Sequence, residues 1–239
     1  MPKVSVIVPV KNDKRLIDLI KALEKQTFKD FEVLIADDSE KKIFNEKTSL
    51  NLRYFHTKPM KITEKLHFLA KKANSNIIAV TESDCIPSET WLEDLLSEYK
   101  DDKTIIVGVQ QILSPYNVVL SYGSLLIPKN AFKIQHDAKL SIADDTDWFF
   151  TLEENGYSFF QINKGVVFHY KDPVKRLFRS FAYAKDNAYI YIKHNKDKRI
   201  IKSILFQSAT IFFSFVTILT LIVFGIYYKL RKIFLKKLR

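Results

Sequence analysis

Acidic side chains gather at two places in this sequence where a short apolar run ends. Asp37 and Asp38 follow the run FEVLIA, and Glu82 and Asp84 follow shortly after the run IIAV. Carboxylate oxygens are the ligands that hard divalent cations prefer, and such a cation can in turn hold phosphate oxygens. Each cluster could instead cap a following helix by accepting hydrogen bonds from its exposed N–H groups. Two such clusters together favour a cation site.

The apolar pattern indicates which elements must position these acids. Strand-like runs are predicted at residues 4–10, 31–36, 52–55, 77–80 and 105–109, and helical spacing of apolar residues at 16–23, 62–73 and from 91 onward. Alternating strands and helices predict an α/β fold with a mostly parallel sheet and helices on both faces. Ligands of such sheets bind at the carboxyl ends of the strands, where both acidic clusters are expected.

Glycine and cysteine usage excludes several classes of protein. The chain has five glycines and contains neither a phosphate-binding loop nor a dinucleotide fingerprint, so ATPase and dehydrogenase functions are not supported. Its single cysteine, Cys85, can form no disulfide within the chain and belongs to no metal-ligand spacing. This usage fits a reducing, cytoplasmic setting.

The net charge of +11 is concentrated toward the C-terminal end. Residues 193–239 contain eleven Lys and Arg but one acidic residue, which leaves the preceding part nearly neutral. Inside this basic region, residues 204–228 carry no charge, and roughly 20 apolar residues suffice for a helix to span a bilayer. The sequence therefore predicts a globular domain over residues 1–200 and a hydrophobic membrane segment with a basic tail over residues 201–239.

This charge distribution also indicates which partners to expect. Basic residues beside an apolar segment are attracted to anionic lipids, so we expect a membrane and not a nucleic acid as the partner. The chain begins with MPKVSVIVPV, which is no signal peptide, and this predicts a cell-membrane protein with its catalytic domain in the cytoplasm. Because both flanks of the segment are basic, the sequence leaves open whether it crosses once or bends back.

Five segments in order resemble the family 2 glycosyltransferases over roughly residues 3–190. They are VSVIVPVKND, IADDSE, VTESDCIPSETWLEDLL, ADDTDWFFTLEENGY and VVFHY. The resemblance implies the GT-A fold, a Rossmann-like nucleotide-diphospho-sugar transferase architecture. It also implies an inverting enzyme that uses Mn²⁺ or Mg²⁺ to move a sugar from a nucleotide-diphosphate donor to a hydroxyl acceptor.

The same resemblance implies roles for residues that bind the donor. Pro9 and Asn12 match the end of the family's first strand, beside the nucleotide. Asp37 and Asp38 match the paired acids that hold the base and ribose. Glu82 stands at the first position of the family's Asp-x-Asp motif, with a longer side chain than the usual Asp.

The resemblance likewise implies which residues contact the metal and the diphosphate and which residue is the catalytic base. Asp84 matches the last acid of the Asp-x-Asp motif, which meets the metal, and His169 matches a histidine near the metal or the diphosphate. Asp144 and Asp145 match a Glu-Asp pair whose second member is the catalytic base. Reaction with a hydroxyl acceptor requires such a carboxylate to take the proton.

Other interpretations of these residues stay open. Asp144, Asp145 and Asp147 could cap the helix that runs through Trp148. Three cations on a later helix could contact a diphosphate or a lipid phosphate, or form a solvated face: Lys175, Arg176 and Arg179. The segment KIQHDAKLSIA lacks the Gly-Gly-Phe-Asp common in the family. The resemblance therefore does not identify the acceptor, which we expect to be a glycan or a lipid-linked glycan. The alternatives are a nucleotidyltransferase and a non-catalytic nucleotide-sugar-binding or scaffolding membrane protein.

Overall fold

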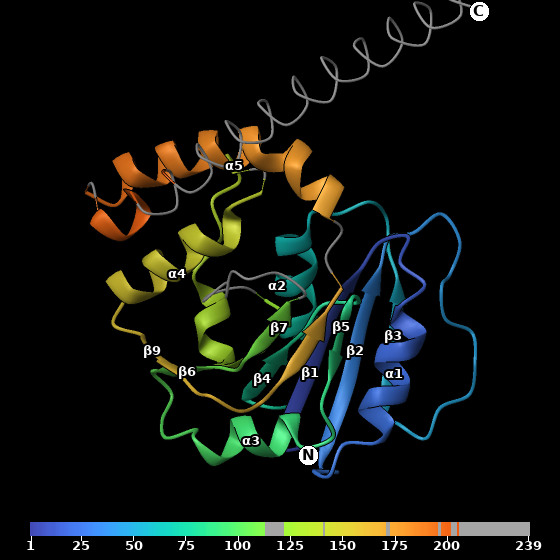
Figure 1. Ribbon diagram of the computed structural model, residues 1–239. Helices are drawn as coiled ribbons and strands as arrows, with labels where there is room; N and C mark the ends of the chain where they lie inside the picture. The colour runs from blue at the N-terminus through green and yellow to red at the C-terminus, as the bar shows by residue number, and fades with distance from the viewer. Residues whose placement is uncertain (113–121, 141, 171–172, 196, 202–204, 206–239) are drawn as a thin grey trace, which may run out of the picture. The chain divides into compact units, whose positions relative to one another are not determined.

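A computed structural model describes residues 1–112, 122–140, 142–170, 173–195, 197–201 and 205 (Figure 1). The chain divides into two compact units. The first comprises residues 1–139 and 144–171, and the second comprises residues 140–143 and 172–239. The acids identified in the sequence belong to the first unit. The predicted boundary at residue 200 stays a prediction.

A seven-stranded sheet forms the centre of the first unit. Its strands are β1 (Val4–Val10), β2 (Phe31–Asp37), β3 (Leu52–His56), β4 (Ile77–Val80), β6 (Thr104–Val107), β8 (Leu125–Pro128) and β9 (Ser158–Gln161). They lie in the order β3-β2-β1-β4-β8-β6-β9. All neighbours pair in parallel except β8, which is antiparallel to both β4 and β6. The predicted mostly parallel α/β sheet is therefore present.

Helices cover both faces of this sheet, as the alternation of elements predicts. The first unit contains α1 (Leu16–Glu24), α2 (Ile62–Lys72), α3 (Trp91–Ser97) and α4 (Asp144–Glu154). Successive strand residues point to opposite faces, so Val6 packs in one buried cluster with side chains of α1 and α3. Ile7 packs in the other, with side chains of α2 and α4. Every residue of β1 is buried, as expected for a central strand.

A second, three-stranded sheet lies in the same unit. It contains β5 (Cys85–Pro87), β7 (Gln110–Ile112) and β10 (Val167–His169), in the order β5-β10-β7. β10 is antiparallel to β5 and parallel to β7, and the register places His169 opposite Cys85 and Ile112. This pairing joins the segment after β4 to a strand more than eighty residues later in the sequence.

The second unit contains α5 (Pro173–Lys193). The buried carboxylate of Asp186 accepts hydrogen bonds from the N–H groups of Ile142 and Ala143, at 2.8 and 3.2 Å. Arg179 is exposed on this helix, whereas the side chains of Lys175 and Arg176 lie outside the described part of the structure.

No helix in the described ranges is both long and apolar enough to span a membrane. Of the predicted membrane segment at residues 204–228, the structure describes Leu205 alone, so the prediction falls outside the described residues.

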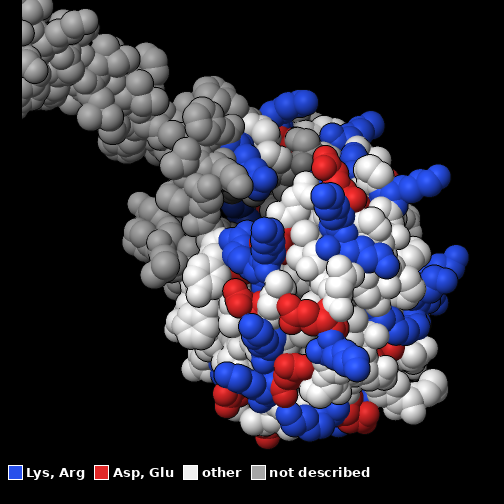
Figure 2. Space-filling model, turned by 90° about the vertical axis from the view of Figure 1, so that its right-hand side faces the viewer, with Lys and Arg blue, Asp and Glu red and all other residues white. Residues whose placement is uncertain are grey.

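Charged side chains are mixed on the face of the molecule in Figure 2. Lys and Arg lie among Asp and Glu there, without a separate basic patch. This mixture agrees with the near-neutral charge of the sequence before residue 193.

Candidate active site

Three neighbouring strands bring the acidic segments to one edge of the large sheet. β1 pairs in parallel with β2 and with β4, so the carboxyl ends of all three strands share that edge. The register places Val10 opposite Asp37, and the N–H of Asp38 donates to the carbonyl of Val10 at 3.3 Å. Asp37 is thus the last residue of its strand and Asp38 begins the loop. The sequence analysis predicted a strand that ends at residue 36, so the observed strand is one residue longer.

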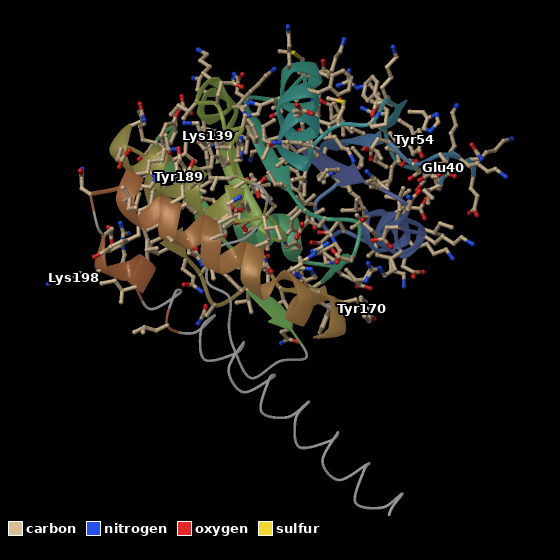
Figure 3. The ribbon with its side chains drawn as sticks, turned by 90° about the horizontal axis from the view of Figure 1, so that it is seen from above. Glu40, Tyr54, Lys139, Tyr170, Tyr189 and Lys198 are labelled. Atoms are coloured by element: carbon tan, nitrogen blue, oxygen red, sulfur yellow. The ribbon has the colours of Figure 1, made fainter. Side chains whose placement is uncertain are left out.

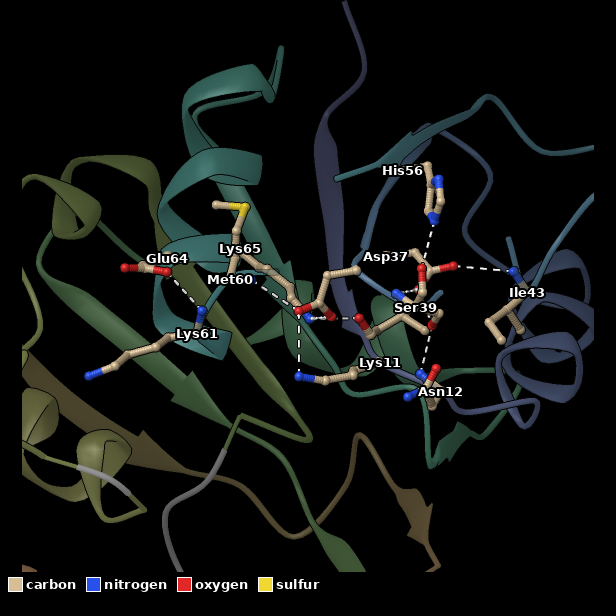
Figure 4. A network of polar contacts seen from close by, with 12 residues as sticks. Lys11, Asn12, Asp37, Ser39, Ile43, His56, Met60, Lys61, Glu64 and Lys65 are labelled. Carbon is tan, nitrogen blue, oxygen red and sulfur yellow. Dashed lines mark hydrogen bonds and ion pairs between the residues drawn. The ribbon is translucent and has the colours of Figure 1, made fainter. Parts of the chain in front are cut away.

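Asp37 is fully buried and is held by protein groups on both of its oxygens (Figure 4). One oxygen accepts from the N–H of Ser39 at 2.9 Å and from the Ser39 hydroxyl. The other accepts from the Tyr54 hydroxyl and from the N–H of Ile43 at 3.2 Å. Burial opposes ionisation, but these hydrogen bonds outweigh it and lower the pKa of Asp37.

The same interaction affects Tyr54, which projects from β3 and is labelled in Figure 3. Burial and the hydrogen bond to Asp37 raise the pKa of Tyr54 to about 12. The phenol therefore stays protonated and acts as a permanent donor to the carboxylate.

Asn12 and His56 complete this part of the edge, on either side of Ser39 (Figure 4). The N–H of Asn12 donates to the Ser39 hydroxyl at 2.6 Å, and His56 Nε2 lies 2.7 Å from the Ser39 carbonyl. Asn12 has a φ of 50°, the left-handed conformation that Asn adopts more readily than most residues. Pro9 is buried within β1, one position before its end, opposite Ala36.

Asp38 forms a buried ion pair with Lys65 of α2. The side chains of Asp38 and Lys65 are 0% and 4% exposed. The Lys65 ammonium also donates to the Val10 carbonyl at 2.6 Å, and the second Asp38 oxygen accepts from the N–H of Met60 at 3.0 Å. Burial opposes ionisation of Asp38, but the hydrogen bond from Lys65 and its neighbours outweigh it and lower the pKa of this carboxyl.

Glu82, Asp84 and His169 converge beside the same edge, although the two acids lie between β4 and β5 and the histidine ends β10. His169 Nε2 lies 3.3 Å from Asp84 Oδ2 and 4.0 Å from Glu82 Oε2. One ligand atom from each of these residues and from Cys85 lies within 4.8 Å of the others, a spacing that fits one metal ion. The antiparallel pairing of β10 with β5 produces this cluster.

The orientation of the His169 ring is fixed from its other side. Nδ1 lies 3.2 Å from Gln110 Oε1, so this nitrogen donates to the amide oxygen. Nε2 consequently faces the two carboxylates. A second hydrogen bond that orients the ring in this way is usual for a metal-ligating histidine.

Arg15 is a further cation beside these acids. Its Nε and Nη2 atoms donate to the carboxylate of Asp13 at 2.8 and 3.0 Å, and Nη1 donates to the carbonyl of Tyr170 at 3.0 Å. Nη2 lies 3.7 Å from Asp84 Oδ2. Although burial opposes ionisation, hydrogen bonds from Arg15 and Ser83 lower the pKa of Asp13. A guanidinium in this place could contact phosphate oxygens.

Asp144 and Asp145 begin α4, in the same unit as the two other clusters. Asp145 Oδ1 accepts from the N–H of Thr146 at 2.7 Å. Burial raises the pKa of Tyr122 well above its usual value, and the negative charges of Asp144, Asp145 and Glu82 raise it further.

The chain belongs to glycosyl transferase family 2, which matches residues 5–158. A curated relative is the chondroitin synthase of Pasteurella multocida (strain Pm70), 23% identical over 124 residues. The match covers 48% of this chain and 13% of that protein, so the chain corresponds to a small part of its relative's length.

Solved structures share the fold. A mannosyltransferase from Pyrobaculum calidifontis, in complex with GDP-Man and Mn²⁺, has a TM-score of 0.64 and 16% identity, with 88% of this chain and 70% of that chain covered. S. aureus TarS in complex with UDP has a TM-score of 0.59 and 17% identity, with 85% and 70% covered. TarS in complex with UDP-GlcNAc has a TM-score of 0.59 and 16% identity, with 86% and 72% covered. The α/β architecture described above is therefore that of GT-A glycosyltransferases.

Several residues of this edge were not anticipated from the sequence. Lys65, Arg15 and Gln110 contact the predicted acids and the predicted histidine, but none of them stands in a recognisable motif. The contact of Tyr54 with Asp37 could have been predicted, because a tyrosine in the neighbouring strand can reach that carboxylate. For Lys175, Arg176 and Arg179, which belong to the second unit, contact with a phosphate stays a prediction.

Proposed function

We propose that this protein is a metal-dependent, inverting glycosyltransferase that moves a sugar from a nucleotide-diphosphate donor to a hydroxyl group of a glycan or lipid-linked acceptor. The observation that carries this proposal is the convergence of Glu82, Asp84 and His169 at the carboxyl edge of the sheet. The negative charges of Glu82 and of the acids of α4 both contribute to the raised pKa of Tyr122. Membership in glycosyl transferase family 2 supports the same reaction.

The residues at this edge fit a divalent cation. Two carboxylates suit Mn²⁺ and Mg²⁺, and the imidazole nitrogen of His169 favours Mn²⁺, because such nitrogens are more typical ligands of transition metals. The thiol of Cys85 is a soft ligand and suits neither ion, so Glu82, Asp84 and His169 would hold the metal. A metal bound there would stabilise the negative charge on the departing diphosphate.

The protein's own side chains would perform the remaining steps. Asp145 would take the proton of the acceptor hydroxyl while the acceptor oxygen bonds to the anomeric carbon. The bond between that carbon and the diphosphate oxygen breaks at the opposite face, which inverts the configuration. Arg15 would contact the diphosphate, because its guanidinium is held beside Asp84 by Asp13 and by the carbonyl of Tyr170.

The donor and its surroundings are proposed as follows. Solved structures of similar fold contain GDP-Man with Mn²⁺, UDP or UDP-GlcNAc, and they support a uridine- or guanosine-diphosphate sugar. Pro9, Asn12, Asp37 and Asp38 line the strand ends at which the nucleotide would bind. The basic, apolar C-terminal sequence supports a location at the cytoplasmic face of the cell membrane, where a lipid-linked acceptor is accessible.

The test uses the full-length protein with Mn²⁺ and a panel of UDP- and GDP-sugars, and it measures both donor binding and nucleotide release. We expect one donor to be consumed only with metal. Asp145→Asn should lower kcat by about 10²–10⁴-fold and leave donor binding intact, because it removes the base alone. Asp84→Asn should abolish metal-dependent donor binding.

Asp101→Asn is the matched control. Asp101 is an exposed carboxylate just before β6, whose amino end lies at the opposite edge of the sheet from the site. It should leave both measurements unchanged. Metal-dependent donor binding with no transfer to any of a broad set of acceptors would contradict catalysis and favour a nucleotide-sugar-binding protein. No binding of any donor would contradict the assignment altogether.

A further inference from the structure

A chain of hydrogen bonds in the first unit joins a buried tyrosine to two half-buried histidines. The hydroxyl of Tyr122 lies 2.7 Å from His136 Nε2, and His136 Nδ1 lies 2.7 Å from His67 Nε2. His67 Nδ1 lies 2.9 Å from the backbone carbonyl of Phe132. These hydrogen bonds thus link α2, the segment after β8 and Tyr122, which stands three residues before β8. None of these residues has a role in the proposed reaction.

The carbonyl at one end determines the direction of every bond in this chain. A carbonyl only accepts, so His67 Nδ1 must carry a proton and His67 Nε2, in the neutral ring, must accept. His136 Nδ1 is then the donor to His67, and His136 Nε2 is left to accept. The hydroxyl proton of Tyr122 is therefore directed toward His136.

Both histidines are suited to this neutral arrangement. Burial lowers the pKa of His67, and burial with the proximity of His67 lowers the pKa of His136 to about 3. The imidazole of His136 stacks on Trp148, with ring centroids 4.3 Å apart and an angle of 22° between the planes. The stacking and the two hydrogen bonds hold this half-buried ring in one orientation.

Tyr122 and its neighbour Gly123 contact both segments that carry the acids of the proposed site. Its ring lies against Trp148 and Phe149, in the first turns of α4, with centroids 6.4 and 6.3 Å away. The carbonyl of the next residue, Gly123, accepts from the hydroxyl of Thr81, the residue before Glu82, at 2.9 Å. A carboxylate that accepts a hydrogen bond from a phenol becomes a weaker base, so the direction of the Tyr122 proton matters for acids near it.

We propose that Tyr122, His136 and His67 form a one-directional relay that turns the Tyr122 proton away from the carboxylates and thereby preserves the basicity of Asp145. This inference rests on the proposed function, because it assigns a positioning role within that site. Its chemical consequence is specific. Loss of the His136 acceptor frees the Tyr122 hydroxyl to donate to the acids, whereas loss of the hydroxyl itself removes the competing donor.

The first measurement does not depend on activity. Nitrogen-15 NMR of the labelled full-length protein reports the tautomer of each histidine, with the two signals assigned by their loss in His136→Phe and in His67→Asn. We expect both rings to be neutral and protonated on Nδ1 at about pH 7. A proton on Nε2 of either ring, or an imidazolium at that pH, would overturn the relay whether or not the protein transfers sugar.

The second measurement tests the link to Asp145. His136→Phe keeps an aromatic ring against Trp148 but removes the acceptor, and we expect it to lower kcat about tenfold with an unchanged donor KM. Tyr122→Phe should retain most of the wild-type kcat. The double variant Tyr122→Phe/His136→Phe should recover the activity lost in His136→Phe, since no hydroxyl is left to donate.

This recovery separates positioning from packing. If the histidine served packing alone, removal of a second buried polar group would not restore kcat, and a double variant as slow as His136→Phe would overturn the proposal. Thermal unfolding of all three variants identifies any loss of kcat that comes from unfolding, and kcat is compared at a temperature at which each variant is folded. If the wild-type protein transfers no sugar, the proposed function fails, while the NMR result still decides the relay.

Discussion

At the residue scale, Asp38 and Lys65 form a buried ion pair at the carboxyl edge, and the exposed ammonium of Lys11 lies 3.9 Å from the second Asp38 oxygen. The side chains of Asp38 and Lys65 are almost entirely buried, and Lys65 also donates to the carbonyl at the end of β1. A buried ion pair contributes little net stability compared with apolar residues of the same shape, but removal of one partner leaves an uncompensated charge. We therefore infer that this pair fixes the position of α2 against the ends of the strands.

Lys65→Met should lower the free energy of unfolding by about 3–5 kcal/mol, because it leaves the Asp38 carboxylate buried without its close cation. Urea denaturation at neutral pH measures this change. Lys71→Met on the same helix is the matched control, since Lys71 is exposed, and it should change stability by less than about 0.5 kcal/mol. Equal effects of the two substitutions would show that the pair is not buried as described.

The pKa of Asp38 gives stability a defined dependence on pH. The pKa of this carboxyl is lowered in the folded protein from an ordinary value of 3.8. The ionised carboxylate thus stabilises the fold at pH values above 3.8. This contribution is lost as the pH falls through the lowered pKa of the folded protein. Asp38→Asn should be less stable than the wild type at about pH 7, and the difference should shrink toward about pH 3. Urea denaturation across this range tests it, and a difference that grows on acidification would contradict it.

Sequence reasoning predicted that acids lie at the ends of the strands, where the structure has them, but did not predict the residues that contact them. Asp37, Asp84 and His169 follow apolar runs, and a run of that kind predicts a strand and its end. Lys65 stands among other lysines of an amphipathic helix, where its type predicts exposure. Its burial depends on how α2 packs against β1, which no local pattern encodes. The chain from Tyr122 to His67 likewise joins positions more than fifty residues apart.

At the element scale, the close approach of three backbone segments joins the large sheet to the small one. The N–H of Gly108, just after β6, donates to the carbonyl of Ser124 at 3.0 Å, and the Ser124 hydroxyl donates to the carbonyl of Gly165 at 3.0 Å. Trp91 of α3 donates to the same hydroxyl at 2.9 Å. A side chain at position 108 would enter this junction.

Gly108→Ala should destabilise the protein by about 1–3 kcal/mol or more, the usual cost of overpacking a filled site. A Cβ atom there would lie 2.4 Å from the Gly165 carbonyl oxygen and 2.2 Å from the Ser124 hydroxyl oxygen. The comparison variant is Gly156→Ala. Gly156 has a φ of 79° with no atom within 4 Å of such a Cβ, so only backbone strain of about 1 kcal/mol is expected. Urea denaturation ranks the two, and a smaller effect at position 108 would contradict the junction.

The order of elements was predictable, but the direction of one strand was not. The strand predicted at residues 4–10 is β1, and the predicted strand at 105–109 is observed as Thr104–Val107, ending just before Gly108. β8 was not predicted, and its residues LLIP form an apolar run too short to distinguish from a buried loop or helix segment. β8 pairs antiparallel with β4 and β6. The periodicity of apolar residues does not predict the direction in which a strand runs.

At the scale of the whole molecule, the charge distribution divides the chain into two parts with different expected partners. The nearly neutral part carries the site, with acids that suit a metal and a cation, Arg15, that suits a diphosphate. The basic part flanks an uncharged run of twenty-five residues. The face in Figure 2 mixes both signs of charge, so this face has no general electrostatic attraction to polyanions. Attraction to a membrane is then expected from the basic C-terminal sequence.

We therefore expect the full-length protein to sediment with vesicles that contain anionic lipid. Cations contribute roughly 1 kcal/mol each near such a surface, so the bound fraction should exceed that on neutral vesicles at low salt. Salt screens this attraction but not insertion of the apolar run. Binding that persists on neutral vesicles in high salt would indicate a segment inside the bilayer, and binding that salt abolishes would indicate a purely electrostatic contact. DNA of equal charge serves as the control polyanion, and tighter binding to DNA than to anionic vesicles would contradict the division of the chain proposed here.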